Sequence, residues 1–170
     1  MELYLLRHGP AVERGTTGFE NDSARPLTPK GRRQLRKISA AMRQMDLNFD
    51  LILSSPFRRA KQTAEIVAAE LKLKKRRKFS RALAPGGGAA VLFRQLARVK
   101  PAPERVLLVG HEPDLSRLVS LLVTGGVQLR MDFKKGGLCK LDAEKLQAGK
   151  YATLAWLLTP KQLKQMIAIR

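Results

Sequence analysis

The chain has 170 residues, of which 44% are hydrophobic and 28% charged. This length predicts one domain with a sizeable core, and this composition argues against wholesale disorder. Lysine and arginine total 33 against 14 acidic residues, so the formal net charge is +19. A field of this sign attracts anions, and nucleic acid, polyphosphate, an anionic membrane surface and acidic proteins all stay open as partners.

Cysteine usage and hydropathy indicate in which cellular compartment the protein is expected. Cys139 is the only cysteine, which excludes an internal disulfide and indicates a reducing compartment. The first residues lack the charged and apolar regions of a signal peptide, and no apolar run approaches the roughly 18 residues of a membrane span. We therefore expect a soluble, cytoplasmic protein, and nothing in the sequence favours a particular oligomeric state.

The first half of the chain alternates between strand and helix patterns. Residues 3–7 form a short apolar run typical of a buried strand. The polar stretch 9–27 predicts a long loop, and loops of that length in compact domains are usually functional. Thr28-Pro29 carries the cap and first-turn signals of a helix with an apolar face. A second strand is expected at 49–53 and a second helix at 56–73.

The next part repeats the alternation. A short strand is expected around Phe79, followed by a glycine-rich loop at 85–88. Residues 89–99 show helical periodicity, and the prolines that follow end this helix. The most apolar strand is expected at 106–109, and a fourth helix at 113–123.

The last part changes character, with strands expected at 137–141 and 151–158 and a short helix after Thr159-Pro160. Alternating strands and helices predict a mostly parallel sheet covered on both faces. The expected fold class is therefore α/β, a single three-layer α/β/α sandwich over residues 1–170. Its last strands would add to one edge in antiparallel orientation.

The two histidines of the chain, His8 and His111, each follow an apolar strand and have a glycine neighbour. Ligands of open parallel sheets bind at the carboxyl ends of the strands. We therefore expect the two imidazoles, which lie 103 positions apart in the sequence, to be neighbours in space. One such histidine is more often structural, but two at equivalent strand ends favour a functional site.

Arginine repeats this pattern. Arg7 precedes His8, and Arg58 and Arg59 follow the second strand. Neighbours on a helix point about 100° apart, so one of the pair should turn inward and the other outward. Guanidinium forks suit phosphate oxygens, and a neutral imidazole can attack phosphorus. The predicted chemistry is phosphoryl transfer through a phosphohistidine intermediate, without a cofactor. The few histidines and the single cysteine predict no metal site.

Four segments, taken in order, resemble the signatures of the histidine phosphatase superfamily, which includes the cofactor-dependent phosphoglycerate mutases. They are Leu6–Gly9, Arg25–Gly31, Ser54–Ala64 and Gly110–Pro113. The resemblance implies a phosphoglycerate mutase-like fold with His8 as nucleophile. It implies that Arg7, Arg59 and His111 bind the phosphate. Arg25 and Gly9 are further expected substrate contacts.

One departure from the pattern concerns the leaving group. Mutase-like members and many phosphomonoesterases carry an acid after the third strand, whereas residues 81–100 contain no Asp or Glu. General-acid help is worth roughly 10²–10⁴ in rate, and an imidazole needs it less than an alkoxide does. The missing acid, the short chain and the motif Arg-Pro-Leu-Thr resemble the SixA-type phosphohistidine phosphatases. This resemblance implies a phosphorylated acidic protein, such as a histidine phosphotransfer domain, as partner.

Several other features have two interpretations. Glu112 and Asp114 suit a helix N-terminus, and Glu112 is also a candidate acid. The run Lys72–Lys78 holds six cations in seven residues and is either a solvated helix end or a docking patch for an acidic protein. Gly86–Gly88 is not followed by the Gly-Lys-Ser/Thr sequence of a P-loop and is expected to leave the pocket mouth open. Cys139 is expected to be a buried thiol rather than a nucleophile.

Two other functions remain. One is a phosphatase for a small or polymeric phosphate, such as a phosphomonoester or polyphosphate, which the high charge favours and the missing acid disfavours for esters. The other is a basic nucleic-acid-binding module. Against the latter, the nine aromatic residues (six Phe, two Tyr and one Trp) are scattered and form no stacking pattern.

Overall fold

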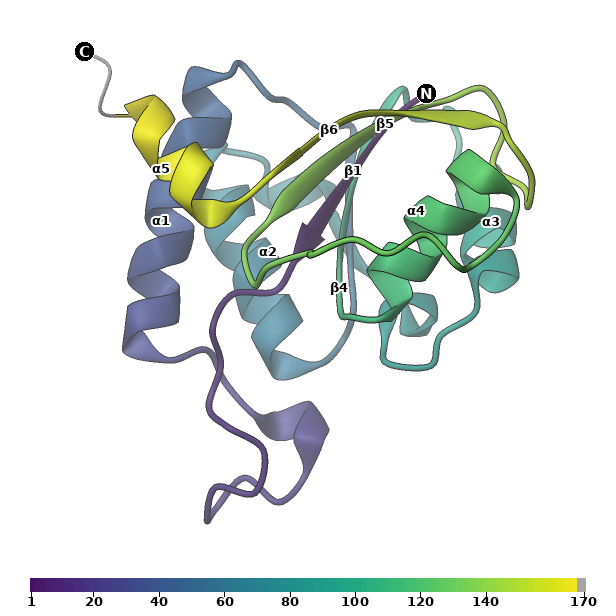
Figure 1. Cartoon of the computed structure of the whole chain (residues 1–170). Helices are drawn as coiled ribbons and strands as arrows, with labels where there is room; N and C mark the ends of the chain where they lie inside the picture. Colours follow the sequence, from purple (N-terminus) through teal and green to yellow (C-terminus); the bar gives the residue numbers. More distant parts are fainter. Residues whose placement is uncertain (168–170) are drawn as a thin grey trace.

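The computed structural model describes residues 1–167 and contains one six-stranded sheet with helices on both faces (Figure 1). The strands are β1 (Glu2–Arg7), β2 (Leu51–Ser54), β3 (Arg77–Phe79), β4 (Arg105–Gly110), β5 (Leu138–Ala143) and β6 (Ala152–Leu158). The helices are α1 (Pro29–Gln44), α2 (Arg58–Glu70), α3 (Ala89–Ala97), α4 (Asp114–Thr124) and α5 (Pro160–Ile167). Three short 3-10 helices are η1 (Asp22–Ala24), η2 (Lys74–Arg76) and η3 (Arg81–Leu83).

The strand order is β3-β2-β4-β1-β5-β6. The first four of these strands run parallel, and β5 and β6 add antiparallel strands at one edge. This arrangement confirms the predicted mixed sheet with its antiparallel edge. The central pair, β1 and β4, is in register from Glu2 with Arg105 to Arg7 with Gly110.

Alternation along the strands builds a core on each face of the sheet. In β1, Tyr4 and Leu6 point to the face covered by α1, α2 and α5, while Leu3 and Leu5 point to the face covered by α3 and α4. Figure 1 shows these two helical layers on opposite sides of the strands. Both faces of β1, β2 and β4 are buried, which explains why these strands read as apolar runs, whereas β3 at the edge is mostly exposed.

Some element bounds differ from those predicted. Helix α2 begins at Arg58 rather than Pro56 and ends at Glu70, because Lys72 adopts a left-handed conformation with φ of 60° that ends the helix. Helix α3 ends at Ala97, two residues before the predicted end. The run Lys72–Lys78 is more than a helix end, since it contains η2 and enters β3.

The predicted loop 9–27 is largely irregular, but it holds η1 and an isolated bridge between Ala11 and Leu27. This bridge brings the two ends of the loop together before α1 starts. Thr28 caps α1 as predicted, because its hydroxyl accepts a hydrogen bond from the Gly31 N–H at 3.0 Å. Within residues 1–167, no helix is long and apolar enough to cross a bilayer.

Candidate active site

The pairing of β1 with β4 brings the two histidines together. His8 follows β1 and His111 follows β4, and the His8 N–H donates to the Gly110 carbonyl oxygen at 3.1 Å. The two ring centroids lie 5.0 Å apart with the rings tilted by 54°. The expectation that these distant residues are neighbours at one edge of the sheet is confirmed.

His8 is held in one tautomer by contacts at both ring nitrogens. Its Nδ1 lies 2.7 Å from the Gly9 carbonyl oxygen, and its Nε2 lies 3.2 Å from Arg59 Nε. Since a guanidinium only donates, Nε2 accepts this bond and the ring proton sits on Nδ1. Burial, reinforced by His111 and the neighbouring arginines and opposed by the bond to Gly9, lowers the pKa of His8 to about 3. At neutral pH the ring is therefore neutral, and its unprotonated nitrogen, Nε2, faces Arg59.

Gly9 supports His8 from the backbone. Its carbonyl accepts from His8 Nδ1, and its N–H donates to the Thr63 hydroxyl at 3.2 Å. That hydroxyl in turn donates to the Arg59 carbonyl oxygen at 2.8 Å. Gly9 was expected to contact substrate, but the structure uses both of its polar backbone groups inside the protein. Thr63, which the sequence analysis did not single out as a site residue, links the His8 loop to α2.

His111 is 2% exposed and its Nε2 lies 2.8 Å from the Ser55 hydroxyl. The Phe57 ring packs edge-on against it, with centroids 5.4 Å apart. Burial and the nearby Arg59 cation lower the pKa of His111 to about 3, so this ring is also neutral at pH 7. Within residues 1–167 its Nδ1 is buried without a hydrogen-bond partner.

The neighbours Arg58 and Arg59 separate as predicted. Arg59 is 3% exposed, whereas Arg58 points to solvent. All three guanidinium nitrogens of Arg59 have partners. Besides His8, they donate to the Asp22 carbonyl oxygen at 2.7 Å and to Asp22 Oδ2 at 2.9 Å.

Asp22 is a site residue that the sequence analysis missed. Its carboxylate lies 2.6 Å from Arg25, 2.9 Å from Arg59 and 3.3 Å from Arg14. Burial raises its pKa, but the hydrogen bonds from Arg25 and Arg59 outweigh this and lower the pKa to about 2. Asp22 is thus ionised at neutral pH and aligns two guanidiniums. Its position three residues before Arg25 was the available signal, since an acid at that spacing can pair across one turn.

A pocket of about 340 Å³ opens over these groups, and Arg7, His8, Arg25, Arg59 and His111 all line it. Arg7 reaches it from the end of β1 and donates to the Phe133 carbonyl oxygen at 2.7 Å. Its Nε is buried without a partner among residues 1–167. The pocket is therefore a cationic site around a neutral imidazole base, which suits a phosphoryl group.

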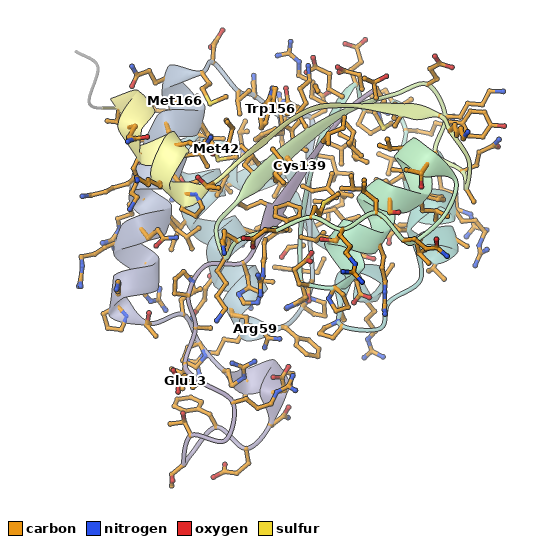
Figure 2. All side chains as sticks on the ribbon, viewed as in Figure 1. Glu13, Met42, Arg59, Cys139, Trp156 and Met166 are labelled. Atoms are coloured by element: carbon orange, nitrogen blue, oxygen red, sulfur yellow. The ribbon has the colours of Figure 1, made fainter. Side chains whose placement is uncertain are left out.

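Two acids also line the pocket, Glu112 and Glu13. Both carboxylate oxygens of Glu112 accept from Ser116, from its N–H at 2.9 Å and its hydroxyl at 2.5 Å, as expected of an acid that caps a helix. Glu13 is exposed, and the sequence analysis overlooked it. Figure 2 places Glu13 on the loop below the sheet, on the same side as Arg59.

The other candidates lie outside this pocket. Cys139 is buried in β5, and burial raises the pKa of its thiol to about 12. Of the predicted glycine loop, Pro85 lines the catalytic pocket, whereas Gly86 and Gly87 line a separate apolar hollow beside His111. No group of three or more His, Cys, Asp or Glu side chains in the described part of the chain is placed to hold a metal ion.

Comparison with known proteins bears on this geometry directly. Residues 3–79, which include His8 and Arg59, match the family model of the histidine phosphatase superfamily, branch 1. The chain belongs to the histidine phosphatase superfamily. An uncharacterized protein of Picosynechococcus is 37% identical over 96% of this chain and 99% of its own length. The phosphohistidine phosphatase SixA of Escherichia coli is 28% identical over 99% of this chain and 100% of its own.

Solved structures share the fold over nearly the whole chain. The protein histidine phosphatase SixA complexed with tungstate aligns with a TM-score of 0.82 at 27% identity, covering 96% of this chain and 100% of that one. The alpha-ribazole phosphatase from Shigella flexneri aligns with a TM-score of 0.67 at 20% identity, over 94% and 97% of the two chains, which shows the fold alone. Family membership and the SixA matches support a phosphatase activity.

Proposed function

We propose that the protein hydrolyses phosphohistidine on another protein, with His8 as the nucleophile. The observation that carries this proposal is the state of His8 Nε2, a neutral base nitrogen 3.2 Å from Arg59 Nε at the wall of a cationic pocket. An imidazole in this state attacks phosphorus without first losing a proton.

The reaction has two transfers. His8 Nε2 forms a bond to phosphorus as the bond from phosphorus to the substrate imidazole breaks. The substrate ring, protonated on its other nitrogen, takes the electron pair and leaves as neutral imidazole. Water then attacks phosphorus as the bond from phosphorus to His8 Nε2 breaks, His8 takes that electron pair and becomes neutral again, and inorganic phosphate and a proton are released. Arg7, Arg59 and His111 surround the position where the equatorial oxygens gather, and preorganised donors there stabilise the charge of the transition state. Neither transfer needs a metal ion.

The state of the acids around the pocket favours phosphohistidine over a phosphate ester as the substrate. The carboxylate of Asp22 is ionised and paired with arginines, and Glu112 is bound to Ser116 through both oxygens. The segment 81–100 holds no acid at all. Neither of these two carboxylates is free to protonate an alkoxide, whereas imidazole leaves more readily without such help. The name of the Escherichia coli relative points to the same substrate class.

A second candidate is hydrolysis of a phosphomonoester or polyphosphate, and Glu13 is the observation that favours it. Glu13 is exposed and lines the pocket, so its carboxyl group is able to approach a leaving oxygen. Under this alternative, Glu13→Gln lowers turnover of esters by about 10²-fold or more and leaves phosphohistidine turnover nearly unchanged.

The test is phosphate release from four substrates at equal concentration: a histidine-phosphorylated phosphotransfer domain, a phosphoserine peptide, a sugar phosphate and polyphosphate. We expect turnover of the phosphohistidine protein well above the other three, and a loss of about 10³-fold or more in His8→Ala. Arg58→Ala serves as the matched control, because this arginine points to solvent beside the pocket residue Arg59.

Other outcomes would refute the proposal. Faster turnover of an ester or of polyphosphate that falls in Glu13→Gln would establish the second candidate. Equal turnover in wild type and His8→Ala would exclude a phosphohistidine intermediate on this residue. Absence of any turnover, together with salt-dependent RNA or DNA binding that survives His8→Ala, would point to the nucleic-acid-binding module instead.

A further inference from the structure

A second groove, of about 680 Å³, adjoins the catalytic pocket. Lys134, Lys135, Lys161 and Lys164 line it, together with Arg7 and Pro160. We call it the lysine groove. Arg7 and Lys135 line the catalytic pocket as well, so the two hollows lie side by side. A ligand that presents a phosphoryl group to His8 therefore has a neighbouring part of its surface over the lysine groove.

The fold brings the lysines of this groove together from segments far apart in the sequence. Lys134 and Lys135 precede β5, where the Gly136 N–H donates to the Arg7 carbonyl oxygen at 3.0 Å. Lys161 and Lys164 lie on α5, which starts where β6 ends and packs along α1 (Figure 1). The side-chain amide of Gln34 on α1 donates to the Lys135 carbonyl oxygen at 3.1 Å and ties the two walls together.

The charge of the groove is largely unbalanced. All four lysines are exposed, and Lys134 pairs with Asp132 at 2.6 Å. Lys135, Lys161 and Lys164 make no salt bridge with any residue in 1–167. Helix α1 contains no acidic residue, and its exposed Lys30 and Lys37 share the helix face of Gln34.

We propose that the lysine groove is the docking surface for an acidic protein that carries the phosphohistidine. This inference rests on the proposed function and names the surface by which the substrate is recognised. Carboxylates on the partner would pair with Lys161 and Lys164, which stand three residues apart on one helix face. Such a cationic rim accelerates encounter with an acidic partner and orients it.

The lining of the groove favours a protein over a nucleic acid or polyphosphate. Apart from Arg7, which it shares with the catalytic pocket, its cations are the point charges of lysines, whereas the arginine forks of Arg25 and Arg59, which match phosphate oxygens, lie in the catalytic pocket alone. Pro10, Thr159 and Pro160 provide apolar surface between the lysines, which side chains of a protein can cover. No aromatic ring lines the groove within the described residues, so bases find no stacking platform there.

The conspicuous run Lys72–Lys78 is poorly placed for this task. Arg76 pairs with Asp50 at 3.5 Å, and Lys75 lines a separate hollow with Glu104. Asp50 and Glu104 precede β2 and β4, at the end of the strands opposite the histidines. The six residues of β4, at about 3.3 Å each, put about 20 Å between the two ends. The run does not adjoin the catalytic pocket.

The experiment compares two charge-matched double variants. The groove variant is Lys161→Glu with Lys164→Glu, and the control is Lys74→Glu with Lys75→Glu. Each replaces two exposed lysines, and none of the four lines the catalytic pocket. Each enzyme is assayed with N-phosphoimidazole and with a histidine-phosphorylated acidic phosphotransfer domain, at low and high salt.

We expect the groove variant to lose about 10-fold to 100-fold in kcat/KM for the phosphoprotein, chiefly through KM, and to lose most of its salt dependence. Its turnover of N-phosphoimidazole stays within about 2-fold of wild type, and the control keeps both activities. Equal losses in the two variants would overturn the groove as the docking surface. So would an equal loss on the small substrate, or a loss confined to polyphosphate hydrolysis.

If the proposed function itself is wrong, the assay gives a different result from a wrong docking surface. In that case the wild-type protein turns over neither N-phosphoimidazole nor the phosphoprotein, and substitutions in the groove make no difference. Wild-type turnover of both substrates, with variants that behave alike, would instead reject only the docking surface.

Discussion

Replacing Asp22 by asparagine keeps the shape of the side chain and removes its charge. In the wild type this carboxylate pairs with Arg25, Arg59 and Arg14, and the first two bonds lower its pKa from 3.8 to about 2 against the effect of burial. That difference corresponds to at most about 2.4 kcal/mol of folding free energy. Because 28% of the side chain is exposed and water screens the pairs, we expect Asp22→Asn to lower the free energy of unfolding by about 1–2 kcal/mol at pH 7.

This loss depends on pH in a defined direction. The pKa is lower in the folded state, so the charge of Asp22 stabilises the fold fully above about pH 5 and ceases to do so as pH falls through about 2. By the same relation, about half of the difference between wild type and variant remains at pH 3.

The assay is urea unfolding at pH 7, 5 and 3, followed by the fluorescence of Trp156, the single tryptophan. This ring is partly buried and packs against Tyr4 with centroids 5.9 Å apart, so unfolding changes its surroundings. Asp132→Asn is the control, because its carboxylate is 72% exposed and, within residues 1–167, forms a salt bridge only with Lys134; we expect a change within about 0.5 kcal/mol. A destabilisation by Asp22→Asn that equals the control at pH 7, or stays constant down to pH 3, would refute the reasoning.

Other consequences follow from the geometry of the pocket. Arg59→Lys keeps the charge but loses the fork that reaches both His8 and Asp22, so kcat/KM for phosphohistidine should fall about 10²-fold while Arg58→Lys stays within about 2-fold; similar losses in both would contradict the burial of Arg59. The ring NMR signals of His8 and His111 should not titrate between pH 8 and 5, since burial lowers both pKa values to about 3, and a midpoint near 6.5 would disprove this. Gly31→Ala should destabilise the protein by more than about 1 kcal/mol in thermal unfolding, because a Cβ there would overlap the backbone of the loop after His8; an unchanged Tm would show that the loop yields.

The amino-acid sequence is most informative where a local pattern meets a general rule of sheet proteins. Apolar runs that end in His8 and in His111 predict strands, and parallel strands expose their carboxyl ends at one edge. The fold class alone thus places both rings at the same end of the sheet, whereas their contact depends on the pairing of β1 with β4. The inward turn of Arg59 likewise follows from helical periodicity and the adjacent motif.

Residues in the long loop 9–27 were harder to place. A loop has no periodicity, so the contacts of Asp22 with Arg25 and Arg59 depend on how the whole segment folds back over the sheet. For the same reason the exposure of Glu13 at the pocket could not be predicted from its neighbours in the chain.

The distribution of charge shows most clearly what the sequence determines and what only the tertiary structure decides. By itself the sequence determined the net charge of +19, the alternation of elements and the identity of the imidazoles and guanidiniums at the strand ends. It also drew attention to Lys72–Lys78, where cations are adjacent in the chain. Only the tertiary structure placed that run away from the catalytic pocket, beside a separate hollow, and gathered Lys135, Lys161 and Lys164 beside the catalytic pocket. Electrostatic attraction acts through space, so cations that are scattered in sequence form one surface only after β5, β6 and α5 have packed onto the sheet.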